Sequence, residues 1–176
     1  MDKYIYFATE MPLLKFGSEK FPSKDDFLAE AEKWMSPKDL SALVEVDLND
    51  YSIRDAKGIY AGFLEFEYAI RRELAAARKA AKEGHEYKSS LLPASFLKEG
   101  TPLEREKKIL SMHWDWLEDA EFGHYSDWDF FCIYFLKLQI LERLSVFDQK
   151  EGHKAFETAV EKSIEQKENA AEAAKQ

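Results

Sequence analysis

SDWDFFCIYFLKLQILERLSVFDQKEGHKAF, residues 126–156, contains seven consecutive apolar residues, Phe130 to Leu136. A helix that is apolar on every side must be covered by other protein or by lipid. Seven residues are too few to cross a bilayer, which needs about 20. The stretch therefore predicts the central, buried helix of a helical domain.

The start of this helix carries residues that favour a helix N-terminus. Ser126 is the predicted N-cap, and Asp127 and Asp129 place negative charge in the first turn, where the helix dipole favours it. Further along, Gln139 and Arg143 are four residues apart and lie beside the apolar stripe. We expect this pair to be a polar anchor of the helix or a contact to a partner.

The composition limits the class of protein. The chain has 176 residues, the size of one domain, and its 14% of aromatic residues can supply a sizeable core. The net charge is −9, and no run of Lys and Arg is free of acids, which argues against nucleic-acid binding. The single cysteine, Cys132, excludes an intrachain disulfide and fits a reducing cytoplasm. We expect no signal peptide and no transmembrane helix.

Apolar residues recur at helical spacing in several other segments, most of which begin with an N-cap residue. The expected helices begin at Ser23, at Ser36-Pro37, at Gly58 (running to Lys82 and stopping at Gly84), at Thr101-Pro102 and at Asp148. Tyr4 to Ala8 is either extended or helical.

These segments predict an all-α fold, a single-domain bundle of about six helices of which two are long. The helical domain is expected to span residues 1–164. A flexible surface loop is expected at about 84–100, where Gly, Pro and Ser gather. Residues 165–176 form a charged tail that we expect to fray.

Glu67 and Arg71 are four residues apart on one face of the predicted 58–82 helix, so they can pair. The pair is either a solvated ion pair or a partly buried anchor that fixes helix register or meets a partner. Gln139 and Arg143 repeat the spacing 72 residues later. The echo fits either an internal duplication or chance.

Four aromatic residues cluster in the sequence around position 120. Trp114, Trp116, Tyr125 and Trp128 are either core residues with tethered N–H groups or candidate interface residues.

No residue pattern predicts catalysis. Glu121-x-x-His124 has the spacing of half of a di-metal site, but the sequence holds no second copy. His113 and Asp115, two residues apart on a helix, do not face each other. We therefore expect no catalytic residue, no metal ligand and no cofactor. A metal-dependent enzyme that uses these four residues is the least favoured alternative.

Four stretches carry a family resemblance: YIYFATEMPLL (4–14), FLEFEYAIRREL (63–74), WDWLEDAEFGHYSDWD (114–129) and LKLQILERLSVFDQKEGHKAF (136–156). They resemble a bacterial family of uncharacterised proteins encoded alongside V/A-type ATPase subunits. The apolar stretch followed by an acid or amide and then an arginine is also similar to the helices of the V-type ATPase subunit called C in archaea and d in eukaryotes. That subunit is longer and has more such helical units.

The resemblance implies a non-enzymatic, cytoplasmic subunit that is peripheral to the inner membrane. It would act in the central stalk as a socket between the rotor shaft and the proteolipid ring, and it would meet the membrane only through these partners. A free-standing adaptor or assembly factor with another partner is the alternative.

Overall fold

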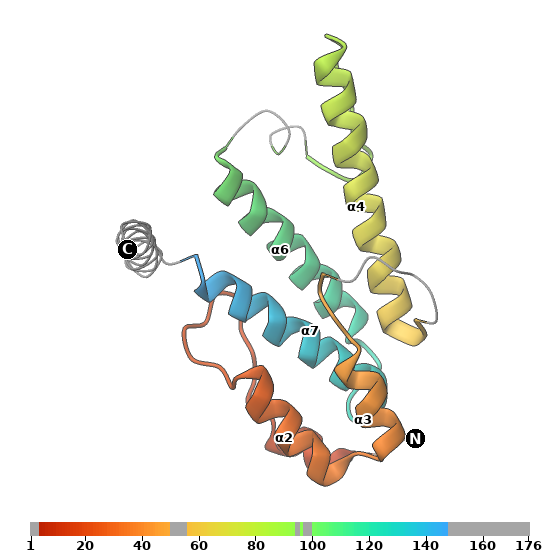
Figure 1. Cartoon of the computed structure of the whole chain (residues 1–176), viewed down its shortest axis with the longest axis vertical. Helices are drawn as coiled ribbons and strands as arrows, with labels where there is room; N and C mark the ends of the chain where they lie inside the picture. The colour runs from red at the N-terminus through yellow and green to blue at the C-terminus, as the bar shows by residue number, and fades with distance from the viewer. Residues whose placement is uncertain (1–3, 50–55, 94–95, 97–99, 148–176) are drawn as a thin grey trace, which may run out of the picture. The chain divides into compact units, whose positions relative to one another are not determined.

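The computed structural model describes residues 4–49, 56–93, 96 and 100–147. Within these residues the chain folds into six helices and contains no strand, which confirms the predicted all-α fold (Figure 1). The helices are α1 (Ile5–Glu10), α2 (Lys24–Trp34), α3 (Pro37–Val44), α4 (Gly58–Lys82), α6 (Pro102–Ala120) and α7 (Trp128–Ser145). None of them is long and apolar enough to cross a membrane.

Helix α7 is the centre of the core, as its apolar run predicts. Every residue from Phe131 to Leu141 is buried, including the polar Lys137 and Gln139. Helices α1, α2 and α6 all contact α7: Phe7 and Phe27 stack on its aromatic rings, and its Lys137 lies over the Trp114 ring of α6. The prediction of a central, buried helix is therefore confirmed.

Stacked aromatic rings join α7 to the N-terminal helices. The Phe7 ring of α1 stacks on Phe131 with ring centroids 4.4 Å apart. Phe27 of α2 stacks on Tyr134 and Phe135 with centroids 5.2 and 5.5 Å away. Such ring pairs add about 0.5–1.5 kcal/mol each beyond the burial of their area. They explain how the six-residue α1, which is too short to be stable alone, is held in place.

Three of the helices begin at the N-cap residue that the sequence predicts. Ser23 and Ser36 each accept a hydrogen bond from the backbone N–H three residues on, and Thr101 forms a reciprocal capping box with Glu104. The predicted cap of α7 is wrong. Asp127 Oδ1, not Ser126, accepts the Phe130 N–H at 2.9 Å, and α7 begins one residue later than expected.

The segment after α4 is predicted to be a flexible surface loop, but part of it is buried in the structure. Gly84 ends α4 at a φ of 75°, and the His85 N–H returns to the Ala80 carbonyl, as in a Schellman motif. Beyond this turn Leu92 and Phe96 are buried against Ile70. Residues 84–100 are rich in Gly, Pro and Ser, and this composition does not indicate the apolar contacts.

The chain divides into two compact units, Met1–Glu142 and Arg143–Gln176. The first contains the buried stretch of α7 and all the other helices described above. In the described part of the second, the Arg143 guanidinium lies over the Phe147 ring, 5.7 Å from its centroid. The predicted helix from Asp148 and the predicted tail at 165–176 lie outside the described residues.

Candidate functional site

Glu67 is the centre of a buried polar cluster that connects α4 and α6. Its Oε2 lies 2.6 Å from Nε2 of His113, and its Oε1 accepts a hydrogen bond from Nε of Arg71 at 2.5 Å. Glu67 is 6% exposed and His113 is 3% exposed, whereas the Arg71 side chain reaches the surface. The cluster is therefore a carboxylate held between a buried imidazole and a half-exposed guanidinium.

The environment sets the charge of Glu67. Burial raises the pKa of this carboxyl, but hydrogen bonds and charge from His113 and Arg71 outweigh burial and leave the pKa below its ordinary value. The rings of Phe63 and Phe66 meet the His113 imidazole edge-on and exclude water from it. Nδ1 of His113 is buried and has no hydrogen-bond partner within the described residues.

The predicted Glu67–Arg71 pair is present, and it is partly buried, not fully solvated, since the Glu67 side chain is 8% exposed and that of Arg71 is 45% exposed. The contribution of His113 was missed, because it comes from 46 residues away. One signal was available in the sequence. His113 falls on the buried face of α6, three residues after Leu110 and four before Leu117.

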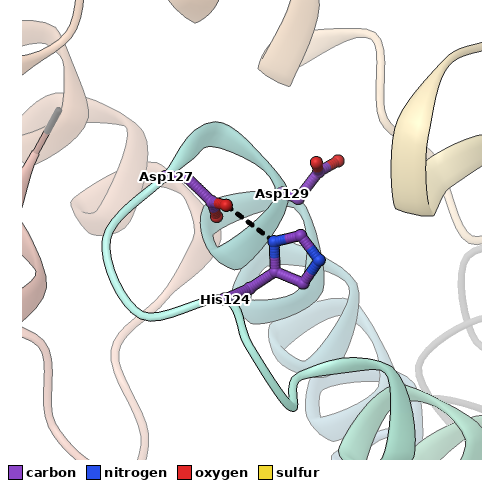
Figure 2. Close-up of side chains that lie close together, drawn as sticks. All are labelled: His124, Asp127 and Asp129. Carbon is purple, nitrogen blue, oxygen red and sulfur yellow. Dashed lines mark hydrogen bonds and ion pairs between the residues drawn. The ribbon is translucent and has the colours of Figure 1, made fainter. Parts of the chain in front are cut away.

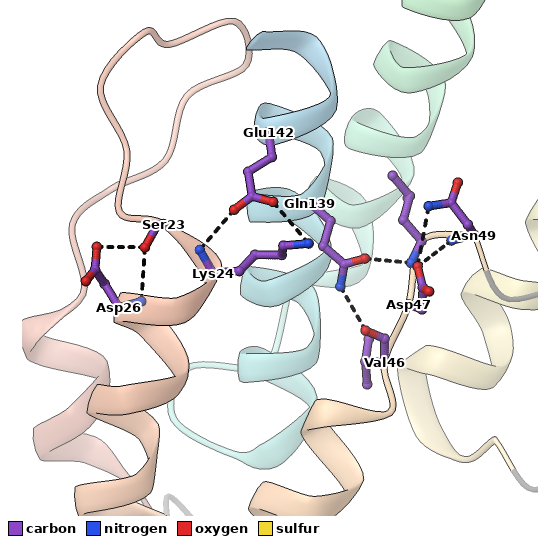
Figure 3. A network of polar contacts seen from close by, with 9 residues as sticks. Ser23, Lys24, Asp26, Val46, Asp47, Asn49, Gln139 and Glu142 are labelled. Atoms are coloured by element: carbon purple, nitrogen blue, oxygen red, sulfur yellow. Dashed lines mark hydrogen bonds and ion pairs between the residues drawn. The ribbon is translucent and has the colours of Figure 1, made fainter. Parts of the chain in front are cut away.

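Gln139 is an anchor of a different kind. Its Nε2 donates to the Val46 carbonyl at 2.8 Å, and its Oε1 accepts the Leu48 N–H at 2.7 Å (Figure 3). The side chain thus binds the backbone that follows α3 as a strand partner would. One turn later Glu142 pairs with the Lys24 ammonium at 3.1 Å and accepts the Lys24 N–H, which fixes the start of α2.

The sequence echo between Glu67/Arg71 and Gln139/Arg143 is not matched by equivalent contacts. Glu67 binds two side chains, whereas Gln139 binds backbone groups. Arg143 belongs to the second compact unit and is exposed.

Of the four aromatic residues predicted as core or interface, Tyr125 is the exposed one, at 66%. Trp114 is buried, with its Nε1 donating to Glu118. Trp116 stacks on Phe66, and Trp128 donates from Nε1 to the Asp39 carbonyl. Trp114 therefore matches the core interpretation, whereas Trp116 and Trp128 are half-buried.

Large apolar side chains of α1, of the end of α2 and of the α6–α7 turn are exposed, as Tyr125 is. The Tyr4 N–H donates to the Ser126 carbonyl at 3.0 Å, which brings the start of α1 against the α6–α7 turn. The Tyr6 ring stacks on Trp34 at the end of α2. We call this surface the aromatic end; its members are Ile5, Tyr6, Trp34, Phe122 and Tyr125, each at least 41% exposed.

His124, Asp127 and Asp129 form the one cluster in the described part of the chain whose geometry could hold a metal ion (Figure 2). One ligand atom from each residue lies within 4.8 Å of the others. Nδ1 of His124 is 2.6 Å from Oδ2 of Asp127. Both carboxylates also have structural roles, since Asp127 caps α7 and Asp129 Oδ1 accepts the Ile59 N–H at the start of α4.

The Glu121-x-x-His124 half-motif does not assemble. Glu121 follows the last residue of α6 and its carboxylate pairs with the Lys137 ammonium, while His124 turns to Asp127. Asp115 is exposed, whereas His113 is buried on Glu67. The four residues of the least favoured enzyme alternative are thus divided among separate environments.

Comparison with known proteins gives one match. Residues 86–167, slightly less than half of the chain, match a family described as "Protein of unknown function (DUF2764)". The matched range contains α6 and α7. No curated protein and no solved structure matches the chain.

Proposed function

We propose that this chain is a non-catalytic subunit of a bacterial V/A-type rotary ATPase, held peripherally at the cytoplasmic side of the inner membrane. Its place would be the central stalk, between the rotor shaft and the proteolipid ring. The proposal rests on the family resemblance of the sequence. The aromatic end is the structural observation that supports it.

The aromatic end has the chemistry of a protein-binding surface. Exposed aromatic side chains are common in interaction sites, and Tyr and Trp are enriched among residues that dominate binding energy. Tyr6 and Trp34 form a stacked pair, and Trp34 Nε1 is fixed by Glu30 Oε1 at 3.1 Å. Rings held in place before binding lose little conformational freedom on association.

The buried anchors support a role in transmitting force. Glu67 with His113 connects α4 to α6, and Gln139 connects α7 to the segment after α3. Satisfied buried polar contacts fix the register of neighbouring helices. A coupling subunit needs this rigidity more than it needs a pocket.

The test is a mild-detergent pulldown of the tagged chain from its own membranes, with co-purifying proteins identified by mass spectrometry. We expect the rotor shaft and the proteolipid ring in stoichiometric amounts. Tyr6→Ser combined with Tyr125→Ser should reduce recovery at least about tenfold, because interface aromatics each contribute about 2 kcal/mol or more. Tyr68→Ser is the control, since Tyr68 is 58% exposed on α4 and is not a member of the aromatic end.

The outcomes separate the alternatives. Equal losses for the Tyr68 control and the double variant would remove the aromatic end from the proposal. Recovery of a partial ATPase complex in small amount would indicate an assembly factor. A preparation without ATPase subunits would overturn the proposal.

A further inference from the structure

A cavity of about 320 Å³ lies between the C-terminal half of α4 and the N-terminal half of α6, remote in sequence from the aromatic end. Its floor is apolar and includes Leu74, Phe96 and Ile109. On α4, Ala77 and Ala81 are one turn apart and contribute only methyl groups, which leaves space between the helix and Phe96. Ligand pockets in proteins begin at about 300 Å³.

The wall of this cavity is fixed by hydrogen bonds. Glu73 of α4 is 9% exposed, and its Oε2 accepts from the Tyr87 hydroxyl at 2.9 Å and from Ser89 Oγ at 2.7 Å. Ser89 Oγ in turn accepts the N–H groups of Leu91 and Leu92. The segment that follows α4 is therefore tied back onto the helix, and the hollow beside it is part of the fold.

Positive charge lies along the rim. Arg78 on α4 and Arg105 on α6 line the cavity from its two sides, and neither guanidinium has an ion-pair or hydrogen-bond partner within the described part of the chain. His85 adds a third nitrogen-bearing side chain. Among the described residues of the lining, Glu86 is the one carboxylate, and it already has an interaction partner. Both guanidinium groups are exposed at the rim, so they remain available to an anionic group that enters the cavity.

We infer that this cavity binds a small amphiphile with a carboxylate head group and an apolar chain. Guanidinium groups bind planar carboxylates through paired N–H donors. The apolar chain would lie on Leu74, Phe96 and Ile109, where its burial stabilises by about 25 cal/mol per Å².

The test is calorimetric titration of the full chain with dodecanoate below its micelle concentration. We expect saturable binding of one dodecanoate per chain. Dodecyltrimethylammonium, which has the same tail and the opposite charge, should bind at least about tenfold more weakly, because a charge-assisted hydrogen bond is lost. Arg78→Gln and Arg105→Gln should each raise the Kd for dodecanoate about tenfold for the same reason.

Two further variants control for surface charge and for tail binding. Lys107→Gln removes an exposed charge of α6 that does not line the cavity, and should leave the Kd within about twofold. Ala77→Phe fills the cavity and should abolish binding while the helical circular dichroism stays unchanged.

Three results would overturn the inference. They are no saturable heat with dodecanoate, equal affinity for the two head groups, and equal effects of the Lys107 and arginine variants. Binding to anionic vesicles without binding of monomeric dodecanoate would assign the rim to a membrane surface and would also overturn it.

Discussion

A single carboxylate, Glu67, connects α4 to α6 through its contact with His113. Replacement by Gln keeps the size of the side chain but removes the charge that faces His113 and Arg71. We expect Glu67→Gln to lower the free energy of unfolding by about 1–3 kcal/mol at neutral pH, the cost of leaving buried polar groups poorly paired. Glu65→Gln, an exposed position two residues earlier, is the control and should change little. Urea titration of the three proteins measures the difference.

The pH dependence of this effect has a definite sign. The pKa of Glu67 is lower in the folded chain than its ordinary value. A group with a lowered folded-state pKa stabilises the protein above its unfolded-state pKa, about 4.3 for Glu, and the stabilisation is lost as the pH falls through the folded-state value. The stability difference between wild type and Glu67→Gln should therefore shrink as the pH falls from about 5 through the lowered folded-state pKa. A difference that stays constant over this range would contradict the proposed charge on Glu67.

The sequence predicts contacts between residues that are close along the chain, but not contacts between distant residues. Caps at Ser23, Ser36 and Thr101 use partners three residues away, and their pattern is visible in the sequence. The Glu67–His113 contact joins residues 46 positions apart, and nothing local to either residue indicates it. Ser126 and Asp127 are both good N-cap residues, so local preference alone could not choose between them.

At the scale of the helices, a side chain of α7 caps the N-terminus of α4. Asp129 stands in the first turn of α7, yet its Oδ1 accepts the Ile59 N–H at 3.0 Å, at the start of α4. The Lys57 side chain at the N-cap position of α4 makes no such bond. Gly58 has a φ of 58°, and a Cβ there would lie 2.3 Å from Asp129 Oδ1. A glycine is therefore required where the two helices approach.

This arrangement predicts coupling between the two positions. Asp129→Ala should lower the free energy of unfolding by about 0.5–2 kcal/mol through loss of the cap. Gly58→Ala should cost at least about 1–2 kcal/mol from the left-handed backbone alone, with a further cost from the clash. In the Asp129→Ala background the clash is gone, so Gly58→Ala should cost less, with a coupling of about 0.5–3 kcal/mol.

A double-mutant cycle followed by thermal unfolding measures that coupling. Asp115→Ala, which removes an exposed carboxylate of α6, replaces Asp129→Ala in the control cycle, and its effect should add to that of Gly58→Ala. Additivity in the Asp129 cycle as well would mean that the two positions do not meet.

At the scale of the whole chain, the question is which residues are needed to form the buried core. Within the described residues, the buried apolar side chains run from Tyr4 to Leu141, and the first compact unit ends at Glu142. The sequence placed the end of the helical domain at residue 164, from apolar residues that recur beyond Asp148. Periodicity of this kind shows that a segment can be helical, but it cannot show whether the segment packs on the rest of the chain.

We expect a chain truncated after Phe147 to unfold cooperatively, with a Tm within about 4 °C of the full-length value, because it keeps every buried contact described for the first unit. Truncation after Leu138 is the matched control. It removes Gln139, Ile140 and Leu141, all of them buried, together with the hydrogen bonds to the segment after α3, and it should abolish the cooperative transition. Differential scanning calorimetry of the three chains distinguishes these results. Loss of cooperativity in the chain that ends at Phe147 would show that residues 148–176 help to form the core.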